Sequence, residues 1–357
     1  MTVQKFIPSN VYWFGLLVAV LHPGFAKADE AVLRQFNSGN DVSLTSGHIN
    51  HFTAFAPESP ETLARMPEID PETGLHVSEV KPGLFYVTDG VYQSAFLATE
   101  EGVMVFDAPP SLAHKLPDAV RLNAPGKAIR ILVYSHGHHD HIGGADVFED
   151  VEGLKVVAHA EVADSIASSG RTGFLAPTET YRDPYAFSLG GETVELTPAS
   201  FHAEDVDTIV YLPKQKFVMA VDTITPGEAP FMNFGATSDV GAYMTLFDTI
   251  LQYDFDHILS GHVSVLGTHE DVIKARDYAH DVWQTAGAGM ENFLDRFNTT
   301  FAEFGYKNAN LAYRATIEAV RRDCSSELTE RWTDKLSVVD VWVDSHCQTV
   351  ILHNIMH

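Results

Sequence analysis

The feature that most constrains the fold of this chain is a dense run of potential metal ligands placed directly after a strongly apolar segment. Residues 135–144 read Ser-His-Gly-His-His-Asp-His-Ile-Gly-Gly, and they follow the apolar run Ile129–Tyr134. A short apolar run of this kind is typical of a buried strand, and the loop after such a strand can present side chains at the edge of a sheet. Several imidazole and carboxylate donors beside a buried strand are costly to place without a partner. The run therefore predicts a metal site rather than a solvated polar loop.

The spacing of the donors within this run suggests two metal positions. His136 and His138 are alternate residues, so both can face one metal ion. The adjacent pair Asp140 and His141 can then turn toward a second ion nearby. His139 occupies the variable position between them, and we interpret it as exposed or as a neighbour of the ligands. Imidazole and carboxylate ligands suit Zn²⁺ and, to a lesser degree, iron or manganese.

Three further donors occupy comparable positions later in the chain, each where an apolar run meets a turn. They are His202, Asp222 and His262. Two metal ions need more ligands than the first run supplies, so we predict that all three join the site. The alternatives are surface histidines at 202 and 262 and a turn-capping aspartate at 222. Asp207, five residues beyond His202, is a candidate to orient a ligand or to cap a turn, because metal-bound histidines usually hydrogen-bond to a second partner.

The order of these residues is similar to that of a known family. The pattern His-x-His-x-Asp-His after a strand, followed by His, Asp and His at increasing distances, resembles the metallo-β-lactamase superfamily over roughly residues 80–270. The run Asp107-Ala108-Pro109 is similar to an aspartate turn that supports the ligands in that family. The resemblance implies an α/β fold, namely a four-layer αβ/βα metallo-β-lactamase sandwich with a two-metal site on one edge. It also implies two Zn²⁺ ions (with Fe or Mn as possible substitutes), a first site of His136, His138 and His202, a second site of Asp140, His141 and His262, and Asp222 as the bridge between them.

The same resemblance implies an enzyme, specifically a metal-dependent hydrolase. In this family two cations lower the pKa of a bridging water, and the resulting hydroxide attacks the scissile bond. Asp140 would orient the nucleophile or shuttle a proton, which makes it the candidate catalytic residue. We expect the substrate to be a small molecule with an ester, lactone or amide-like bond.

Departures from the family pattern leave other activities open. Zinc β-lactamases of the family carry cysteine or serine where this chain has Asp222, and acyl-homoserine lactonases typically carry tyrosine where it has Thr225. A promiscuous β-lactam hydrolase and a mononuclear-iron sulfur dioxygenase of the same fold are the alternative activities. A non-enzymatic binding protein on a degenerate scaffold would lack a ligand, and this sequence lacks none of the seven.

The rest of the chain mixes short β-type runs with helical stretches, which also favours a layered α/β fold. We predict strands at Leu84–Val87, Ala95–Ala98, Val103–Phe106, Ile129–Tyr134, Leu154–Ala158, Glu192–Leu196, Thr208–Leu212 and Phe217–Val221, and a helix at Leu112–Leu122. From Glu270 onward the pattern is mostly helical, and Tyr313 and Ile317 are predicted to share one helix face. The predicted segments are a signal peptide at 1–28, an N-terminal extension at 29–75, a metallo-β-lactamase-like domain at 76–275 and a helical C-terminal segment at 276–357.

The N-terminus predicts export. Lys5 precedes an apolar run at Val11–Leu21, and Ala26-Lys27-Ala28 matches a signal-peptide cleavage site. The apolar run is short for a bilayer span, so an uncleaved anchor is the less favoured alternative. We therefore expect a periplasmic or secreted protein without a stable membrane anchor.

The charge of the chain argues against one class of partner, and its two cysteines leave open whether a disulfide forms. The chain carries 48 acidic and 23 basic residues, a formal net charge of −25. A surface this acidic repels phosphate backbones, which argues against nucleic acid as a partner and favours a small-molecule substrate. In an exported protein Cys324 and Cys347 can form a disulfide, although two buried thiols fit the sequence nearly as well. The sequence does not define an oligomeric state.

Two other groups of residues could lie near the site. Phe231, Met232 and Phe234 follow Asp222 in a loop and could shape a hydrophobic pocket, although ordinary loop packing fits equally well. The segment containing His48 and His51 could approach the metals only if the N-terminal extension folds over them, and we expect these histidines to be exposed.

Overall fold

A computed structural model describes residues 55–56, 58–202 and 207–357 of the chain. The predicted signal peptide, His48 and His51 lie outside the described residues, so what the sequence predicts for them stays a prediction. The chain divides after Phe55 into two units, of which the second, Ala56–His357, is compact. The second unit carries the candidate metal ligands.

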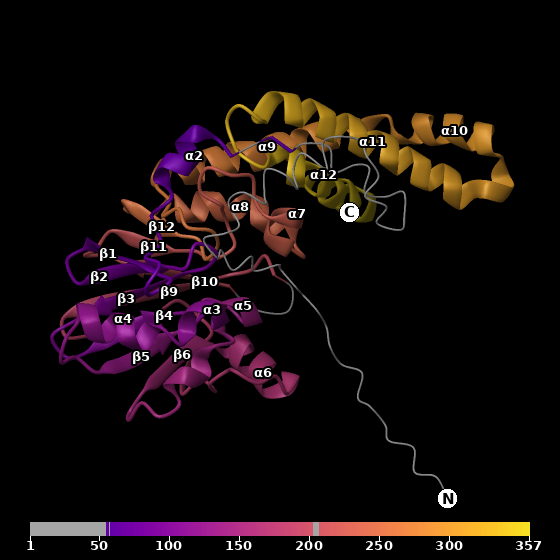
Figure 1. Cartoon of the computed structure of the whole chain (residues 1–357). Helices are drawn as coiled ribbons and strands as arrows, with labels where there is room; N and C mark the ends of the chain where they lie inside the picture. The colour runs from indigo at the N-terminus through magenta and orange to yellow at the C-terminus, as the bar shows by residue number, and fades with distance from the viewer. Residues whose placement is uncertain (1–54, 57, 203–206) are drawn as a thin grey trace, which may run out of the picture. The chain divides into compact units, whose positions relative to one another are not determined.

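The second unit contains a seven-stranded sheet and a five-stranded sheet (Figure 1). The first sheet has the order β1 to β7, with strands β1 His76–Lys81, β2 Leu84–Thr88, β3 Gln93–Ala98, β4 Val103–Phe106, β5 Ile129–Val133, β6 Lys155–His159 and β7 Glu179–Tyr181. The second has the order β12-β11-β10-β9-β8, with strands β8 Tyr185–Leu189, β9 Glu192–Ala199, β10 Asp207–Leu212, β11 Phe217–Met219 and β12 His257–Leu259. Strands β1 to β4 form an antiparallel meander, and β4 to β7 are parallel. The second sheet is antiparallel apart from the β11–β12 pair.

The two sheets pack face to face, and helices cover the outer face of each (Figure 1). Strand β11 shows the arrangement, because Phe217 and Met219 join the core between the sheets while Val218 joins the core beneath the C-terminal helices. Side chains alternate between the two faces of a strand, so a strand covered on both faces is apolar at every position. This is the four-layer αβ/βα sandwich that the sequence predicts.

Helices from different parts of the chain cover the two sheets. The first sheet is covered by α3 Pro110–Ala113, α4 Leu116–Asn123, α5 His139–Ile142 and α6 Ala160–Ser169. The second is covered by α8 Val240–Ile250, α9 His269–Glu291, α11 Ala309–Trp332 and α12 Val339–Met356. The remaining helices are α2 Pro60–Arg65, α7 Met232–Ala236 and α10 Phe293–Phe304, with 3₁₀ turns at Ala145–Phe148 and Tyr306–Asn308. Within the described part of the chain, no helix is long and apolar enough to span a membrane.

The structure differs from the sequence predictions in detail. The helix predicted at Leu112–Leu122 is two short helices, and Pro117 lies in the first turn of α4, where its missing N–H leaves no hydrogen bond unmade. Strands β1, β7, β8 and β12 are additional to those predicted. In α11, Ile317 is buried but Tyr313 is 38% exposed, so the buried face is rotated toward Thr316. Helix α9 runs without a break through position 275, and the predicted division there stays a prediction.

Two links hold the C-terminal helices in place, one between two of them and one to an earlier helix. Cys324 of α11 and Cys347 of α12 form a disulfide, which answers the question that the sequence leaves open. Arg65 of α2 forms an ion pair with Asp271 of α9, with 2.6 Å between Nη2 and Oδ2. Part of the predicted N-terminal extension is thereby held against the helical layer.

Candidate metal centre

The seven predicted ligands all follow strands at their carboxyl ends. His136 and His138 lie between β5 and α5, and Asp140 and His141 lie within α5 itself. The remaining three lie beyond the ends of β9, β11 and β12; they are His202, Asp222 and His262. Strands β9, β11 and β12 run in the same direction within the second sheet, and β5 belongs to the first sheet. The ends of these strands bring donors that are far apart in sequence to one place.

The first group of donors consists of His136, His138, His202 and Asp222, whose ligand atoms all lie within 4.8 Å of one another. His136 Nε2 is 3.3 Å and His138 Nδ1 is 3.9 Å from Asp222 Oδ2. His202 Nε2 is 2.9 Å from the carbonyl oxygen of Gly235, so a cation bound by this nitrogen would replace that hydrogen bond. These are the residues that the sequence assigns to one metal, together with the predicted bridge.

The second group consists of Asp140, His141 and His262, again with ligand atoms within 4.8 Å of one another. His141 Nε2 and His262 Nε2 are each 3.6 Å from Asp140 Oδ2. The same two nitrogens lie 3.1 and 3.0 Å from Asp222 Oδ1. Asp222 therefore faces the first group with one oxygen and the second group with the other. The structure brings all seven side chains together, and metal binding by them stays a prediction.

The residues fit a pair of cations. Among the described residues, the buried atoms His136 Nε2 and Asp222 Oδ1 make no well-aligned hydrogen bond, although imidazole and carboxylate atoms of the site lie within 3.0–3.3 Å of them. His141 Nε2 and His262 Nε2 stand 3.1 Å apart, and only one of them can hold a proton between them. A shared cation would satisfy donor atoms of this kind, and a set of imidazoles and carboxylates suits Zn²⁺.

Without a cation, the electrostatics of the site favour the metal-binding forms of Asp222 and His138, but they favour the protonated form of His141, which must lose its proton to coordinate a metal. Burial alone would raise the pKa of the Asp222 carboxyl, but the imidazoles of His141 and His262 outweigh it and hold that pKa well below its usual range. Burial would lower the pKa of His141, yet the carboxylates of Asp222 and Asp140 raise it to about 10. Burial lowers the pKa of His138 to about 3, which leaves a neutral imidazole. An ionised carboxylate and a neutral imidazole are the species that coordinate metals.

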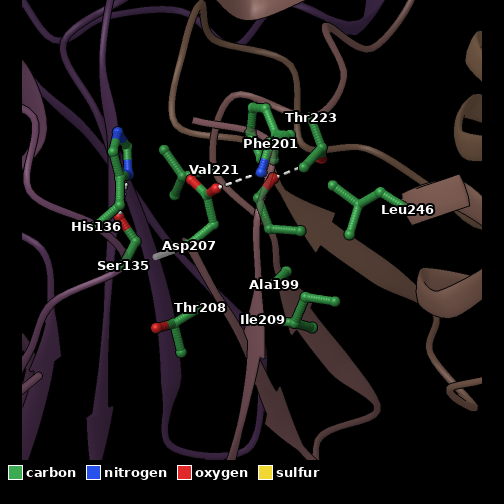
Figure 2. Close-up of a pocket in the computed structure, with 11 residues that line it drawn as sticks. Ser135, His136, Ala199, Phe201, Asp207, Thr208, Ile209, Val221, Thr223 and Leu246 are labelled. Carbon is green, nitrogen blue, oxygen red and sulfur yellow. Dashed lines mark hydrogen bonds between the residues drawn. The ribbon is translucent and has the colours of Figure 1, made fainter. Parts of the chain in front are cut away.

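Residues behind the ligands fix their orientation, as the sequence predicts for Asp207. Its Oδ1 lies 2.8 Å from His202 Nδ1. Its Oδ2 accepts a hydrogen bond of 3.0 Å from the Phe201 backbone, as Figure 2 shows. The Ser135 hydroxyl lies 3.0 Å from His136 Nδ1. These side chains line a small cavity behind the ligands (Figure 2). Such partners fix which ring nitrogen points at the metal.

The aspartate turn noted in the sequence also supports the ligand loop. Asp107 Oδ1 accepts a 2.8 Å hydrogen bond from the Ser135 backbone, immediately before the first ligand. Asp107 and Asp222 both adopt a left-handed backbone, with φ of 60° and 63°, which aspartate tolerates better than most residues. His139 is exposed, with its ring 5.6 Å from that of Phe174, in keeping with the variable position that the sequence assigns to it.

Tyr92 is a residue of the site that the sequence analysis missed. It lies in the turn between β2 and β3, and its hydroxyl donates a long hydrogen bond of 3.5 Å to Asp140 Oδ2. Its ring lies 5.0 Å from that of His262 and 5.9 Å from that of His141. Burial and the carboxylate of Asp140 raise the pKa of Tyr92, so the hydroxyl keeps its proton as a donor. An aspartate and a glycine shortly before it indicate only a turn, so nothing local marks this tyrosine.

We expect Tyr92→Phe to lower kcat/KM by about fivefold, because a long hydrogen bond to a charged group contributes about 1 kcal/mol. Steady-state kinetics would measure the loss. Tyr211→Phe, a substitution of another tyrosine outside the site, serves as the control for the loss of a hydroxyl. Equal kcat/KM for Tyr92→Phe and wild type would show that the Tyr92 hydroxyl does not contribute to the reaction.

Comparison with known proteins gives matches of sequence and of fold. Residues 87–262 match the family model described as the metallo-beta-lactamase superfamily. The chain is 27% identical over 245 residues to the 2,4-dinitroanisole O-demethylase subunit alpha of a Nocardioides strain, covering 64% of this chain and 72% of that protein. A metallo-beta-lactamase from Pontibacter korlensis superposes with a TM-score of 0.50 at 20% identity, covering 57% of this chain and 97% of that structure.

The matched region contains the ligand-bearing part of the fold. It begins in β2 and ends at His262, so it includes all seven donors and most strands of both sheets. The structural likeness, at this identity, concerns the fold alone. The ordered ligand pattern, the four-layer sandwich and the match over residues 87–262 together show that this chain belongs to the metallo-beta-lactamase superfamily.

Proposed function

We propose that the protein is a dinuclear zinc hydrolase that opens an ester, lactone or amide-like bond in a small molecule. The observation that carries this proposal is the position of Asp222, which faces one donor group with Oδ2 and the other with Oδ1. A carboxylate shared in this way supports two cations at short separation rather than one. This arrangement favours the dinuclear hydrolase over the mononuclear-iron dioxygenase.

Residues of this chain would have separate roles in proton transfer and in orienting the reacting groups at this centre. Two zinc ions bound here would supply Lewis-acid activation of water and of the scissile bond. The side chain of Asp140 is 43% exposed, so it can accept a proton from the attacking water and still reach the leaving group. Tyr92, which donates to the same carboxylate, can orient Asp140 or donate to a developing negative charge.

Cleavage of an activated aryl ether is a second candidate reaction. The relative from Nocardioides is named as a subunit of a 2,4-dinitroanisole O-demethylase, and the alignment spans 72% of its length. Hydrolysis of such an ether consumes one water and releases a phenol and an alcohol, so it needs the same activated water and no oxidant. Promiscuous β-lactam hydrolysis ranks lower, because Asp222 stands where zinc β-lactamases carry cysteine or serine.

Metal analysis followed by a substrate panel tests the proposal. We expect two zinc ions per chain, and hydrolysis of phenyl acetate or a simple lactone that chelation removes and zinc restores. 2,4-Dinitroanisole and a penicillin in the same panel would separate ether and β-lactam cleavage from ester hydrolysis. A single tightly bound iron per chain with no hydrolysis would contradict the proposed function.

We also propose that the protein is exported and acts on a small molecule in the periplasm or outside the cell. The support is the A-x-A site at Ala26-Lys27-Ala28 after a short apolar run, and a disulfide suits an oxidising compartment. Intact-mass measurement of the exported protein is expected to give a chain that begins at Asp29. A mass that includes residues 1–28 would contradict cleavage.

A further inference from the structure

Residues next to the metal centre form a turn of unusual handedness. Asn233, Phe234, Gly235 and Ala236 have φ of 55°, 55°, 71° and 62°, which makes four consecutive left-handed residues, three of them not glycine. We call these residues the left-handed turn. Left-handed backbone is unfavourable for L-residues, and strained residues of this kind persist only where their surroundings hold them, often at functional sites.

The left-handed turn lies directly against the metal ligands. The carbonyl oxygen of Gly235 is 2.9 Å from His202 Nε2. A Cβ added to Gly235 would come within 2.5 Å of the backbone oxygen of Asp222. No side chain therefore fits between the turn and the predicted bridging ligand, so the turn forms one wall of the centre.

Helix α12 holds the left-handed turn from its other side. His346 is fully buried, its Nε2–H donates to the Phe231 carbonyl at 3.2 Å, and its Nδ1 accepts from the Tyr278 hydroxyl at 2.8 Å. Burial lowers the pKa of His346 to about 4, in keeping with a neutral ring. The ring of Phe234 stacks on His346 at 4.3 Å, and the backbone N–H of Asn233 is also bonded to α12. The wall is consequently fixed in place.

This fixed wall keeps apolar side chains at the surface. Phe231 and Met232, at the start of the same segment, are 45% and 40% exposed. The ring of Phe231 lies 4.9 Å from the half-buried Trp342 of α12 at an interplanar angle of 60°. Val91 is also exposed, and it precedes Tyr92 on the side of the second donor group. Apolar side chains held exposed on segments that contact the donor groups, as Gly235 and Tyr92 do, are typical of a binding site.

We propose that Phe231, Met232 and Trp342 form a shelf that binds the aromatic ring of the substrate while its scissile bond lies at the metal centre. The inference rests on the proposed function, because it says how the protein binds the part of the substrate that lies away from the hydrolysed bond. Edge-to-face packing against Phe231 and Trp342 favours an aromatic ring over a saturated one. A shelf that is already rigid loses little entropy when the ring binds. The substrate class is therefore an aromatic ester or ether.

Binding of phenol and of its saturated counterpart cyclohexanol tests the shelf without requiring turnover. The metal-loaded, full-length protein would be titrated with each compound by calorimetry. We expect wild type to bind phenol more tightly than cyclohexanol, and Phe231→Ala to weaken phenol binding by about tenfold, the scale of an aromatic pair plus its buried area. Leu294→Ala removes an equally apolar side chain that is 73% exposed on α10, and it is expected to leave phenol binding unchanged.

The outcomes separate this inference from the proposed function. Selective loss of phenol binding in Phe231→Ala supports the shelf even if no compound of the substrate panel is hydrolysed. Unchanged phenol binding in Phe231→Ala, or equally tight binding of cyclohexanol to wild type, overturns the shelf even if the protein is an active hydrolase. Since Phe231 is half exposed, the variant should fold, and Met232→Ala provides a second test on the same surface.

Discussion

Asp222→Asn should remove hydrolysis almost completely and lower the metal content below two ions per chain. Removal of an outer partner of a metal ligand costs up to about a hundredfold in affinity or activity, and a carboxylate shared by two metals should cost more. The side chain of Asp222 is 7% exposed and faces His136, His141 and His262, so its charge acts at short range in a desolvated site. Asparagine tolerates the left-handed backbone of this position as aspartate does, so the substitution removes the charge without adding strain.

The measurement pairs metal analysis with kcat/KM on the best substrate of the panel. Asp118→Asn removes the same charge from an exposed position of α4, and it is expected to match wild type in both readouts. Replacement of Asp222 by alanine would add backbone strain to the loss of charge, which makes the asparagine variant the cleaner test. An asparagine variant with two bound metals and wild-type turnover would refute Asp222 as the bridge.

The side chains that the structure brings together at this candidate centre could be predicted because their chemical type and their position carry the signal. Four donors in 136–141 stand directly after a buried strand, and His202 follows another apolar strand. Tyr92 carries no such signal, because a tyrosine after a turn is ordinary and only the pairing of β2 with β3 brings it to Asp140. The need for glycine at position 235 could not be predicted either, because it arises from the close approach of Gly235 to the Asp222 backbone in the folded chain.

The fold could be predicted best where packing covers a strand on both sides. Val103–Phe106 is buried at every position, so its apolar run alone indicates a strand. Strand β1 is an edge strand of mixed polarity with partly exposed residues, and only its pairing with β2 makes it a strand. The handedness of residues 233–236 depends on α12, more than a hundred residues later, and local propensity cannot foresee it.

Gly235→Ala should disable the metal centre through backbone displacement, although glycine carries no ligand atom. The added Cβ would stand 2.5 Å from the backbone oxygen of Asp222, and a backbone atom cannot rotate away as a flexible side chain can. Either the left-handed turn or Asp222 must move, and a shift near 1 Å in a catalytic group can cost about a hundredfold in rate. We expect kcat/KM to fall by at least that factor and the affinity for zinc to fall with it.

Gly126→Ala is a matched control for the cost of placing alanine in a left-handed backbone conformation. Gly126 has φ of 79° against 71° for Gly235, and a Cβ added there would meet no atom within 4 Å. Both variants should lose about 1 kcal/mol in the free energy of unfolding from the left-handed conformation, measured by urea titration. Only Gly235→Ala should also lose zinc affinity and activity. If the two variants retain equal zinc content and equal kcat/KM, the left-handed turn does not press against the metal ligands, and both the wall and the shelf built on it are wrong.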